Sequence, residues 1–291
     1  MLNPKKGITM KKLITPFLLV GALASCENAP GPDLYTNYIS DGEAHPLVIL
    51  VGGSDGGNYF ANPNMKPLMD RYHDYGFSVA SMGYFDTLGT PDSPIELSLN
   101  EIDARIKAIT EDSSIKGQCV ALLGFSKGAE LSLLLGSHFN TVNHIVAAYP
   151  SHVVWNAVKT PMSYSSWSID GQPLPYIEAP LLSFDMLSGI FTGEYRNAFT
   201  DALSEASPKE LNDAAIPVEK IKGSVTLVSA RQDQIWPSFE MANKIEQRLS
   251  DNSYENPVLH IDLDGDHYSY NKETMDTVLT HLKRVMGSEC N

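Results

Sequence analysis

Short runs of wholly apolar residues recur along the chain and constrain its fold more than any other feature. The run HPLVILVGG is rich in branched residues and ends in glycines, which predicts a buried strand. Helical patterns lie between several of the runs, and this alternation predicts an α/β fold whose mostly parallel sheet is covered by helices on both faces. The predicted strands span residues 45–53, 76–84, 117–124, 144–150, 223–230 and 257–265, and the predicted helices span 94–110, 127–138, 237–250 and 272–286.

Residues 151–222 interrupt the alternation. They are rich in proline, serine and tyrosine, and they contain no clear strand. A long insertion in a domain of this type usually covers the site or shapes its mouth. We find no internal repeat and no domain linker, so we predict one domain over residues 45–288 with an insertion at about 151–222.

The N-terminal residues predict export. MKKLITPFLLVGALASC, residues 10–26, has two lysines, an apolar run too short for a spanning helix, and a Leu-Ala-Ser-Cys ending. That ending resembles the bacterial lipobox, in which the cysteine is lipidated and becomes the mature N-terminus. We predict a signal peptide over 1–26, lipidation of Cys26 and a tether over 27–44, with a plain cleaved signal peptide as the alternative. The protein would then be anchored to a bacterial membrane, on the periplasmic or cell-surface side.

Charge and cysteine content exclude several classes of protein. The net charge is −14, and a chain beginning at Cys26 would carry 17 basic and 35 acidic residues. Such a surface repels nucleic acid, and no basic motif offsets it. Cys26, Cys119 and Cys290 are not spaced as metal ligands and imply no disulfide framework, and we interpret Cys119 as a packed core residue. We predict no metal, no cofactor and no nucleic-acid partner.

The stretch GFSKG carries the first candidate catalytic residue. A serine between glycines is common in ordinary turns, but Gly124-x-Ser126-x-Gly128 follows a predicted strand and precedes a predicted helix. That context is the one required for a nucleophile elbow, whose tight and strained turn leaves no room for side chains beside the serine. We therefore predict that Ser126 is a nucleophile.

A nucleophilic serine needs a base and an acid that orients it, and in this fold the order is serine, acid, histidine. His267 follows the last predicted strand, and Asp233 follows the strand at 223–230. Both lie at carboxyl ends of strands, where sites in open α/β sheets gather. Asp264 and Asp266 are alternative acids, which rank lower because they share the loop of the histidine.

The oxyanion of the intermediate needs two donors. The backbone N–H of Lys127 would be one, because it follows the nucleophile. The loop GGSDGG after the first predicted strand would supply the other, from Gly53 or Ser54, of which we favour Ser54. Phosphate binding is the rival interpretation of this loop, but it lacks the lysine and the spacing of the known phosphate-binding motifs.

Three further residues accompany these positions. Glu130 lies one helical turn after Ser126, and we interpret it as structural, as a partner of a basic group or as an aid in orienting the site. Trp236 and Tyr268 lie close after the acid and the histidine. They either line an acyl pocket or pack in the ordinary way.

Several blocks together resemble the catalytic domain of the acyl-CoA thioesterase and bile-acid-CoA:amino acid N-acyltransferase family. They are LVGGSDGG, YGFSVASMGYF, GFSKGAELSL, SARQDQIWPS and GDHYSY, in that order, and SIDGQPLPY is similar to the insertion of the family. The resemblance covers roughly residues 45–285. It implies an α/β-hydrolase fold and a triad of Ser126, Asp233 and His267.

The sequence departs from the family in two places. Family members that act on acyl-CoA in animals carry an N-terminal β-sandwich domain, which we expect to be absent here. The N-acyltransferases use a cysteine nucleophile, whereas this chain has serine, which favours transfer to water over amidation. Coenzyme A is cytoplasmic, so export predicts that the acyl donor is an ester, another thioester or an amide.

The sequence thus predicts an exported serine hydrolase that cleaves a small acyl ester or thioester through an acyl-enzyme. Two other functions stay open at this point. One is a peptidase or amidase that uses the same triad, and the other is a non-catalytic surface lipoprotein that binds a ligand.

Overall fold

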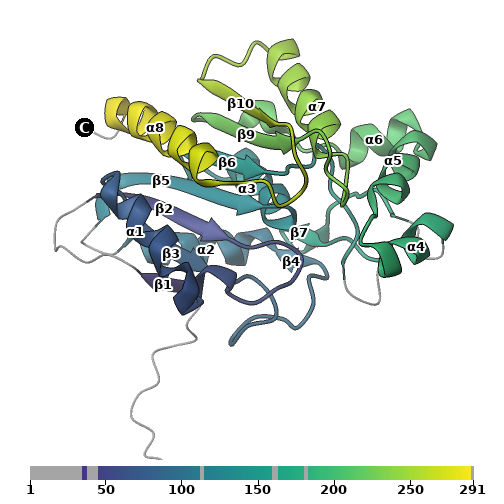
Figure 1. The fold of residues 1–291 in the computed structure, drawn as a ribbon, viewed down its shortest axis with the longest axis horizontal. Helices are drawn as coiled ribbons and strands as arrows, with labels where there is room; N and C mark the ends of the chain where they lie inside the picture. The colour runs from purple at the N-terminus through teal and green to yellow at the C-terminus, as the bar shows by residue number, and fades with distance from the viewer. Residues whose placement is uncertain (1–34, 38–44, 112–114, 159–162, 180–182, 290–291) are drawn as a thin grey trace, which may run out of the picture. The chain divides into compact units, whose positions relative to one another are not determined.

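The computed structural model describes residues 35–37, 45–111, 115–158, 163–179 and 183–289. The predicted signal peptide, Cys26 and most of the predicted tether lie outside these residues. The described residues form two sheets and the helices that surround them (Figure 1).

A seven-stranded sheet organises the fold. Its order is β1-β3-β2-β5-β6-β9-β10, and every neighbouring pair is parallel except the edge pair β1 and β3. The prediction of a mostly parallel sheet is confirmed. The strands are β1 (Tyr35–Asn37), β2 (His45–Val51), β3 (Ser78–Met82), β5 (Ile115–Phe125), β6 (His144–Ala148), β9 (Val225–Ala230) and β10 (Val258–Leu263).

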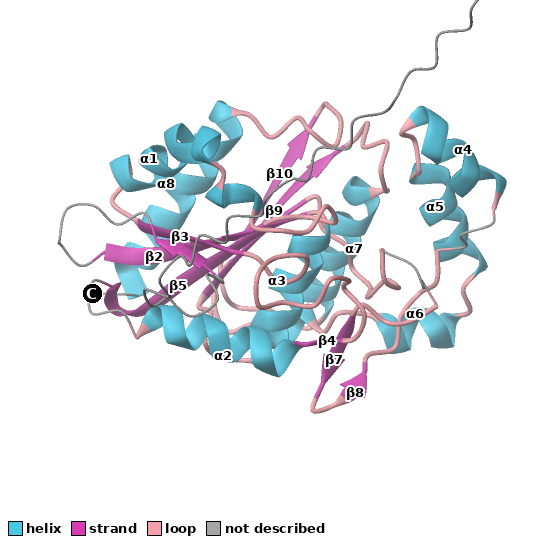
Figure 2. Ribbon diagram, turned by 90° about the horizontal axis from the view of Figure 1, so that it is seen from below, coloured by secondary structure: helices cyan, strands magenta, loops and turns pink. Residues whose placement is uncertain are grey.

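Helices cover both faces of this sheet, as predicted. Alternate residues of β2 point to opposite faces, so Leu47 and Ile49 pack with one helical layer while Val48 and Leu50 pack with the other. Figure 2 shows α1 and α8 on one side of the sheet and α2 and α3 on the other. The first layer comprises α2 (Leu99–Thr110), α3 (Lys127–His138) and α7 (Ser238–Asp251), and the second comprises α1 (Lys66–Asp74) and α8 (Lys272–Glu289).

The insertion has more structure than its sequence predicts. The short strands β7 (Trp167–Ile169) and β8 (Gln172–Pro173) join β4 (Leu97–Ser98) in a second, three-stranded sheet. The expectation of no strand in this segment is therefore wrong, because strands of two or three residues are too short to show a hydrophobic period. Three helices follow, namely α4 (Phe184–Thr192), α5 (Arg196–Glu205) and α6 (Pro208–Ala214).

Three further observations concern the start of the domain, Cys119 and the character of the helices. Strand β1 places residues 35–37 in the main sheet, upstream of the predicted domain start at residue 45. Cys119 is buried in β5, as predicted, and it is disulfide-bonded, which the number and spacing of the cysteines did not imply. In the part of the chain that the structure describes, no helix combines the length and apolar character needed to cross a bilayer.

Candidate active site

Ser126 lies at a sharp turn between β5 and α3. Its φ of 54° and ψ of −116° are unusual for a residue with a side chain, and its N–H donates to the carbonyl of Ala148 at 2.8 Å. The residue is partly exposed at the carboxyl end of the sheet. This strained, partly exposed position is the geometry expected of a nucleophile elbow.

The two glycines of the turn are required by the close approach of backbone segments. A Cβ on Gly124 would lie 1.9 Å from the carbonyl oxygen of Gly128. A Cβ on Gly128 would lie 2.2 Å from the carbonyl oxygen of Gly52, in the loop after β2. The glycines therefore let α3 begin directly against the neighbouring strand and bring Ser126 beside that loop.

Asp233 and His267 meet at the same edge of the sheet, after β9 and β10. His267 Nδ1 lies 2.9 and 2.8 Å from the two carboxylate oxygens of Asp233, and both side chains are buried. The backbone N–H groups of Ile235 and Trp236 also donate to Asp233 Oδ1, at 2.9 and 3.2 Å. Among the contacts of the described residues, no hydrogen bond joins the Ser126 hydroxyl to this imidazole, a contact that is often long before substrate binds.

The alternative acids have other partners. Asp266 accepts from the Tyr268 N–H at 2.9 Å and from the Ser269 hydroxyl at 2.8 Å, and these bonds lower the pKa of its carboxyl. Asp264 accepts from Gln232 Nε2 at 2.9 Å. The structure thus pairs His267 with the acid that comes from a different loop.

The predicted oxyanion loop contacts the serine directly. A Cβ on Gly53 would lie 3.3 Å from Ser126 Cβ, which places the Gly53 backbone against the nucleophile. The hydroxyl of Tyr84 donates to the carbonyls of Gly52 and Gly53, at 3.1 and 3.0 Å. Because a trans peptide directs its N–H opposite to its C=O, these bonds orient the N–H groups of Gly53 and Ser54 away from Tyr84.

Lys127 contributes to this arrangement through its backbone N–H and through its side chain. Its N–H lies in the first turn of α3, where helical amides have no partner within the helix. Its side chain is buried, and Nζ lies 2.9 Å from both carboxylate oxygens of Glu130. Burial lowers the pKa of Lys127 and raises that of Glu130, and the attraction between the two groups opposes both shifts.

The same carboxylate holds the start of the insertion. Glu130 Oε1 accepts from the Trp155 N–H at 3.1 Å and from Trp167 Nε1 at 2.7 Å. Trp167 in turn packs against the ring of Tyr84, with centroids 5.7 Å apart. The structural interpretation of Glu130 is confirmed, since it pairs with Lys127 and links α3 to the insertion.

Two residues that the sequence did not single out contact the imidazole loop. The ring of Tyr149 lies over that of His267, with centroids 4.6 Å apart and an angle of 31° between their planes. Gln234 Oε1 accepts from the His267 N–H at 3.2 Å, while its carbonyl accepts from Arg196 N–H at 2.9 Å. Tyr149 also has a positive φ, of 55°, but such a conformation leaves no mark in the sequence.

The two aromatic residues that follow the acid and the histidine both lie beside the imidazole, with ring centroids 6.3 Å from that of His267 for Trp236 and 5.5 Å for Tyr268. Trp236 is buried in the core of the insertion with Trp155 and Met241, which agrees with ordinary packing. Tyr268 is largely exposed, next to His267. Cys26, the predicted lipidation site, lies outside the described residues.

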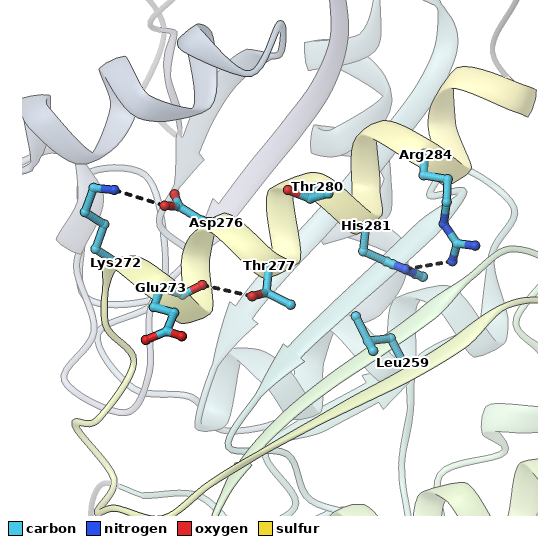
Figure 3. A pocket seen from close by; sticks show the side chains of 8 residues that line it. All are labelled: Leu259, Lys272, Glu273, Asp276, Thr277, Thr280, His281 and Arg284. Atoms are coloured by element: carbon cyan, nitrogen blue, oxygen red, sulfur yellow. Dashed lines mark hydrogen bonds and ion pairs between the residues drawn. The ribbon is translucent and has the colours of Figure 1, made fainter.

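Two hollows lie away from the serine. One, of about 680 Å³, is lined by α8 and by Leu259 of β10 and mixes acidic and basic side chains, among them Asp276 and Arg284 (Figure 3). The other, of about 260 Å³, lies between α4, the start of α5 and the loop that carries Asp233. Over the described residues, no group of three or more His, Cys, Asp or Glu side chains is arranged to hold a metal ion.

Comparison with known sequences identifies a family. Residues 102–267 match the model described as BAAT / Acyl-CoA thioester hydrolase C terminal. Human acyl-coenzyme A thioesterase 6 is 25% identical over 185 residues, which cover 64% of this chain and 41% of that protein. The mouse peroxisomal succinyl-coenzyme A thioesterase is 26% identical over 188 residues, with 63% and 40% covered. The chain thus spans about two fifths of the length of these relatives.

Comparison with solved structures identifies the fold. The Pyrococcus furiosus esterase Pf2001 superposes with a TM-score of 0.54 at 16% identity, over 84% of this chain and 85% of that one. The α/β hydrolase GrgF from Penicillium sp. sh18 superposes with a TM-score of 0.54 at 12% identity, over 87% and 98%. Together with the doubly covered parallel sheet, these neighbours show the α/β-hydrolase fold that the resemblance implied.

Proposed function

The chain belongs to the BAAT / acyl-CoA thioester hydrolase C-terminal family, and on that premise we propose that it is a serine hydrolase of acyl esters or thioesters. One observation carries the proposal. The Asp233–His267 pair, with its 2.8 and 2.9 Å contacts, lies at the same edge of the sheet as a serine held at φ 54°. This is the arrangement that nucleophilic catalysis by serine needs.

The chemistry follows from the atoms that each residue presents. Asp233 occupies His267 Nδ1, so Nε2 is left to take the proton of the Ser126 hydroxyl as its oxygen attacks the acyl carbonyl carbon. The leaving group departs with that proton, and an acyl-enzyme remains. His267 then takes a proton from the water that attacks the acyl-enzyme, and it returns this proton to the Ser126 oxygen as the bond to the acyl group breaks and the acid is released.

Backbone amides would stabilise the charge on the intermediate. The Lys127 N–H lies at the N-terminus of α3, where the helix dipole also favours negative charge. The Gly53–Ser54 segment, held by Tyr84, would supply the second donor. Both donors belong to elements that the close-packed glycines bring against Ser126.

Export and lipidation at Cys26 form the second part of the proposal. The lipobox-like ending of the N-terminal segment supports it, and so does the disulfide at Cys119, because disulfides persist mainly in oxidising compartments. Radioactive palmitate should label the chain and should not label Cys26→Ser. Equal labelling of both would contradict lipidation at Cys26.

A substrate panel tests the hydrolase. The full chain should cleave short-chain nitrophenyl esters and acyl thioesters faster than matched amides. Ser126→Ala should lower kcat at least about a thousandfold, because the nucleophile is removed. Ser204→Ala, an exposed serine of α5, serves as the control and should keep full activity. Full activity in Ser126→Ala would refute the proposal, and faster cleavage of the amides would make the protein an amidase.

A further inference from the structure

Helix α4 presents its apolar side chains to solvent, which is the reverse of what a surface helix normally does. Phe184 is 83% exposed, Leu187 45%, Ile190 64% and Phe191 90%. At about 100° per residue, these four side chains share one face about 120° wide. We refer to them as the α4 apolar face. Figures 1 and 2 both show α4 at the outer end of the insertion.

The rest of the helix is fixed to the protein in the usual way. The Ser183 side chain caps its N-terminus by accepting from the Met186 N–H at 3.1 Å, and Gly193 ends it in a left-handed conformation. Gly189 lies flat on the ring of Tyr195, because a Cβ there would come within 2.3 Å of that ring. The α4 apolar face is therefore held outward by a well-packed inner face.

The apolar face is large enough to act as a contact surface. Two nearly bare phenylalanines with a leucine and an isoleucine expose on the order of 500 Å² of apolar surface. A patch of that size is comparable to the largest apolar patch on a typical monomer, and such a patch is often a functional contact surface. The polar side of the helix, with Asp185, Ser188 and Thr192, faces the hollow beside the Asp233 loop.

Charge and chain length favour a lipid bilayer as that partner over a second copy or an acidic protein. From Cys26 onward the chain carries 17 basic and 35 acidic residues, so two copies repel each other. About eight residues separate Cys26 from β1, and they span at most about 28 Å when extended. A lipid on Cys26 would therefore keep the domain within reach of the membrane.

We propose that α4 is an interfacial helix, whose apolar face enters the bilayer to which Cys26 is anchored. A short helix can bury its apolar face about 5–10 Å into the boundary between headgroups and acyl chains without crossing the membrane. Because α4 carries no basic residue, the contact is apolar and does not depend on anionic lipids. The proposal rests on the proposed lipid anchor and hydrolase, and it deepens them by naming the surface on which the hydrolase acts.

Tryptophan fluorescence in reconstituted vesicles tests this docking. The full chain is inserted into phosphatidylcholine vesicles with brominated acyl chains, which quench tryptophans that contact them. Phe191→Trp reports from the α4 apolar face, and Leu88→Trp is the matched control, since Leu88 is 74% exposed on the loop between β3 and β4. The three native tryptophans are buried and common to both variants.

We expect the emission of the added tryptophan in Phe191→Trp to shift to shorter wavelength and to be quenched, while that of the added tryptophan in Leu88→Trp is unaffected. Equal emission from the two variants would overturn the proposal. A shift at position 191 without quenching would overturn it in favour of a protein partner, and failure to remain on the vesicles would overturn both docking and anchor. Fluorophosphonate labelling of Ser126 in the same sample tests the proposed hydrolase independently of membrane docking.

Discussion

The carboxylate of Asp233 accepts hydrogen bonds from three donors. Two are backbone N–H groups of its own loop, and the third is the imidazole of His267. The backbone bonds fix the rotamer, so the oxygens that face His267 cannot turn away. Sequence order and strand position predicted this pairing, because Asp233 and His267 follow neighbouring parallel strands. The geometry of the loop, with Gln234 bonded to the next loop, could not be predicted, because it depends on contacts distant in sequence.

Asp233→Asn should lower kcat/KM for ester substrates by about ten-thousandfold, because the amide stabilises neither the required tautomer nor the imidazolium. Asp266→Asn should leave kcat/KM almost unchanged, since that carboxylate bonds Tyr268 and Ser269. Steady-state kinetics on one ester measure both. An equal loss in the two variants would contradict the assignment of Asp233.

Tyr84 is a positioning residue that acts through the loop after β2. Tyr84→Phe removes only the hydroxyl that donates to the Gly52 and Gly53 carbonyls, so the loop amides lose their orientation. We expect kcat to fall about tenfold with little change in KM. The control is Tyr254→Phe, which removes a hydroxyl donor to the Gly223 carbonyl near the opposite end of the sheet. A fall in melting temperature alone, without a change in kcat, would contradict this role.

At the scale of elements, the long buried strands and the helices between them were predictable, because each shows a continuous apolar run or a helical period. The edge strand β1 and the small sheet of β4, β7 and β8 were not, since two or three residues carry no period. The junction between α3 and the insertion was only partly predictable. The sequence indicates a structural role for Glu130, but it cannot indicate the bonds to Trp155 and Trp167, which span 25 and 37 residues.

The Lys127–Glu130 pair should hold that junction together. Lys127→Met leaves a buried carboxylate without its counter-charge, and we expect it to lower the free energy of unfolding by about 3–5 kcal/mol. Adding Glu130→Gln should restore part of this loss, because glutamine is neutral and still accepts from the two tryptophans. Urea unfolding at neutral pH measures each variant. Simple addition of the two single losses would contradict a coupled pair.

At the scale of the whole molecule, the proposed lipidation of one cysteine limits which cysteine can pair with Cys119. Cys119 is disulfide-bonded, and the chain has only Cys26 and Cys290 as further cysteines. The sulfur of a lipidated Cys26 is occupied, so we predict that Cys119 pairs with Cys290, which follows the end of α8 at Glu289. Mass spectrometry of a digest without reduction should show that linked peptide pair. A link between Cys26 and Cys119 would contradict lipidation.

The acidic surface of the molecule bears on its partners rather than on its chemistry. Its negative charge makes nucleic acid an unexpected ligand. The site, in contrast, is formed by close approaches between backbone segments and by one buried pair of an acid and an imidazole. The family resemblance implied the fold and the three site residues in advance.

The central claim is that Ser126 is the activated nucleophile, and covalent labelling tests it most directly. A fluorophosphonate should form one adduct on the full chain, and peptide mapping should place it on Ser126. His267→Ala should label far more slowly, because the base that activates the hydroxyl is gone. An unlabelled wild-type chain, or an adduct mapped to another residue and retained in Ser126→Ala, would contradict the claim.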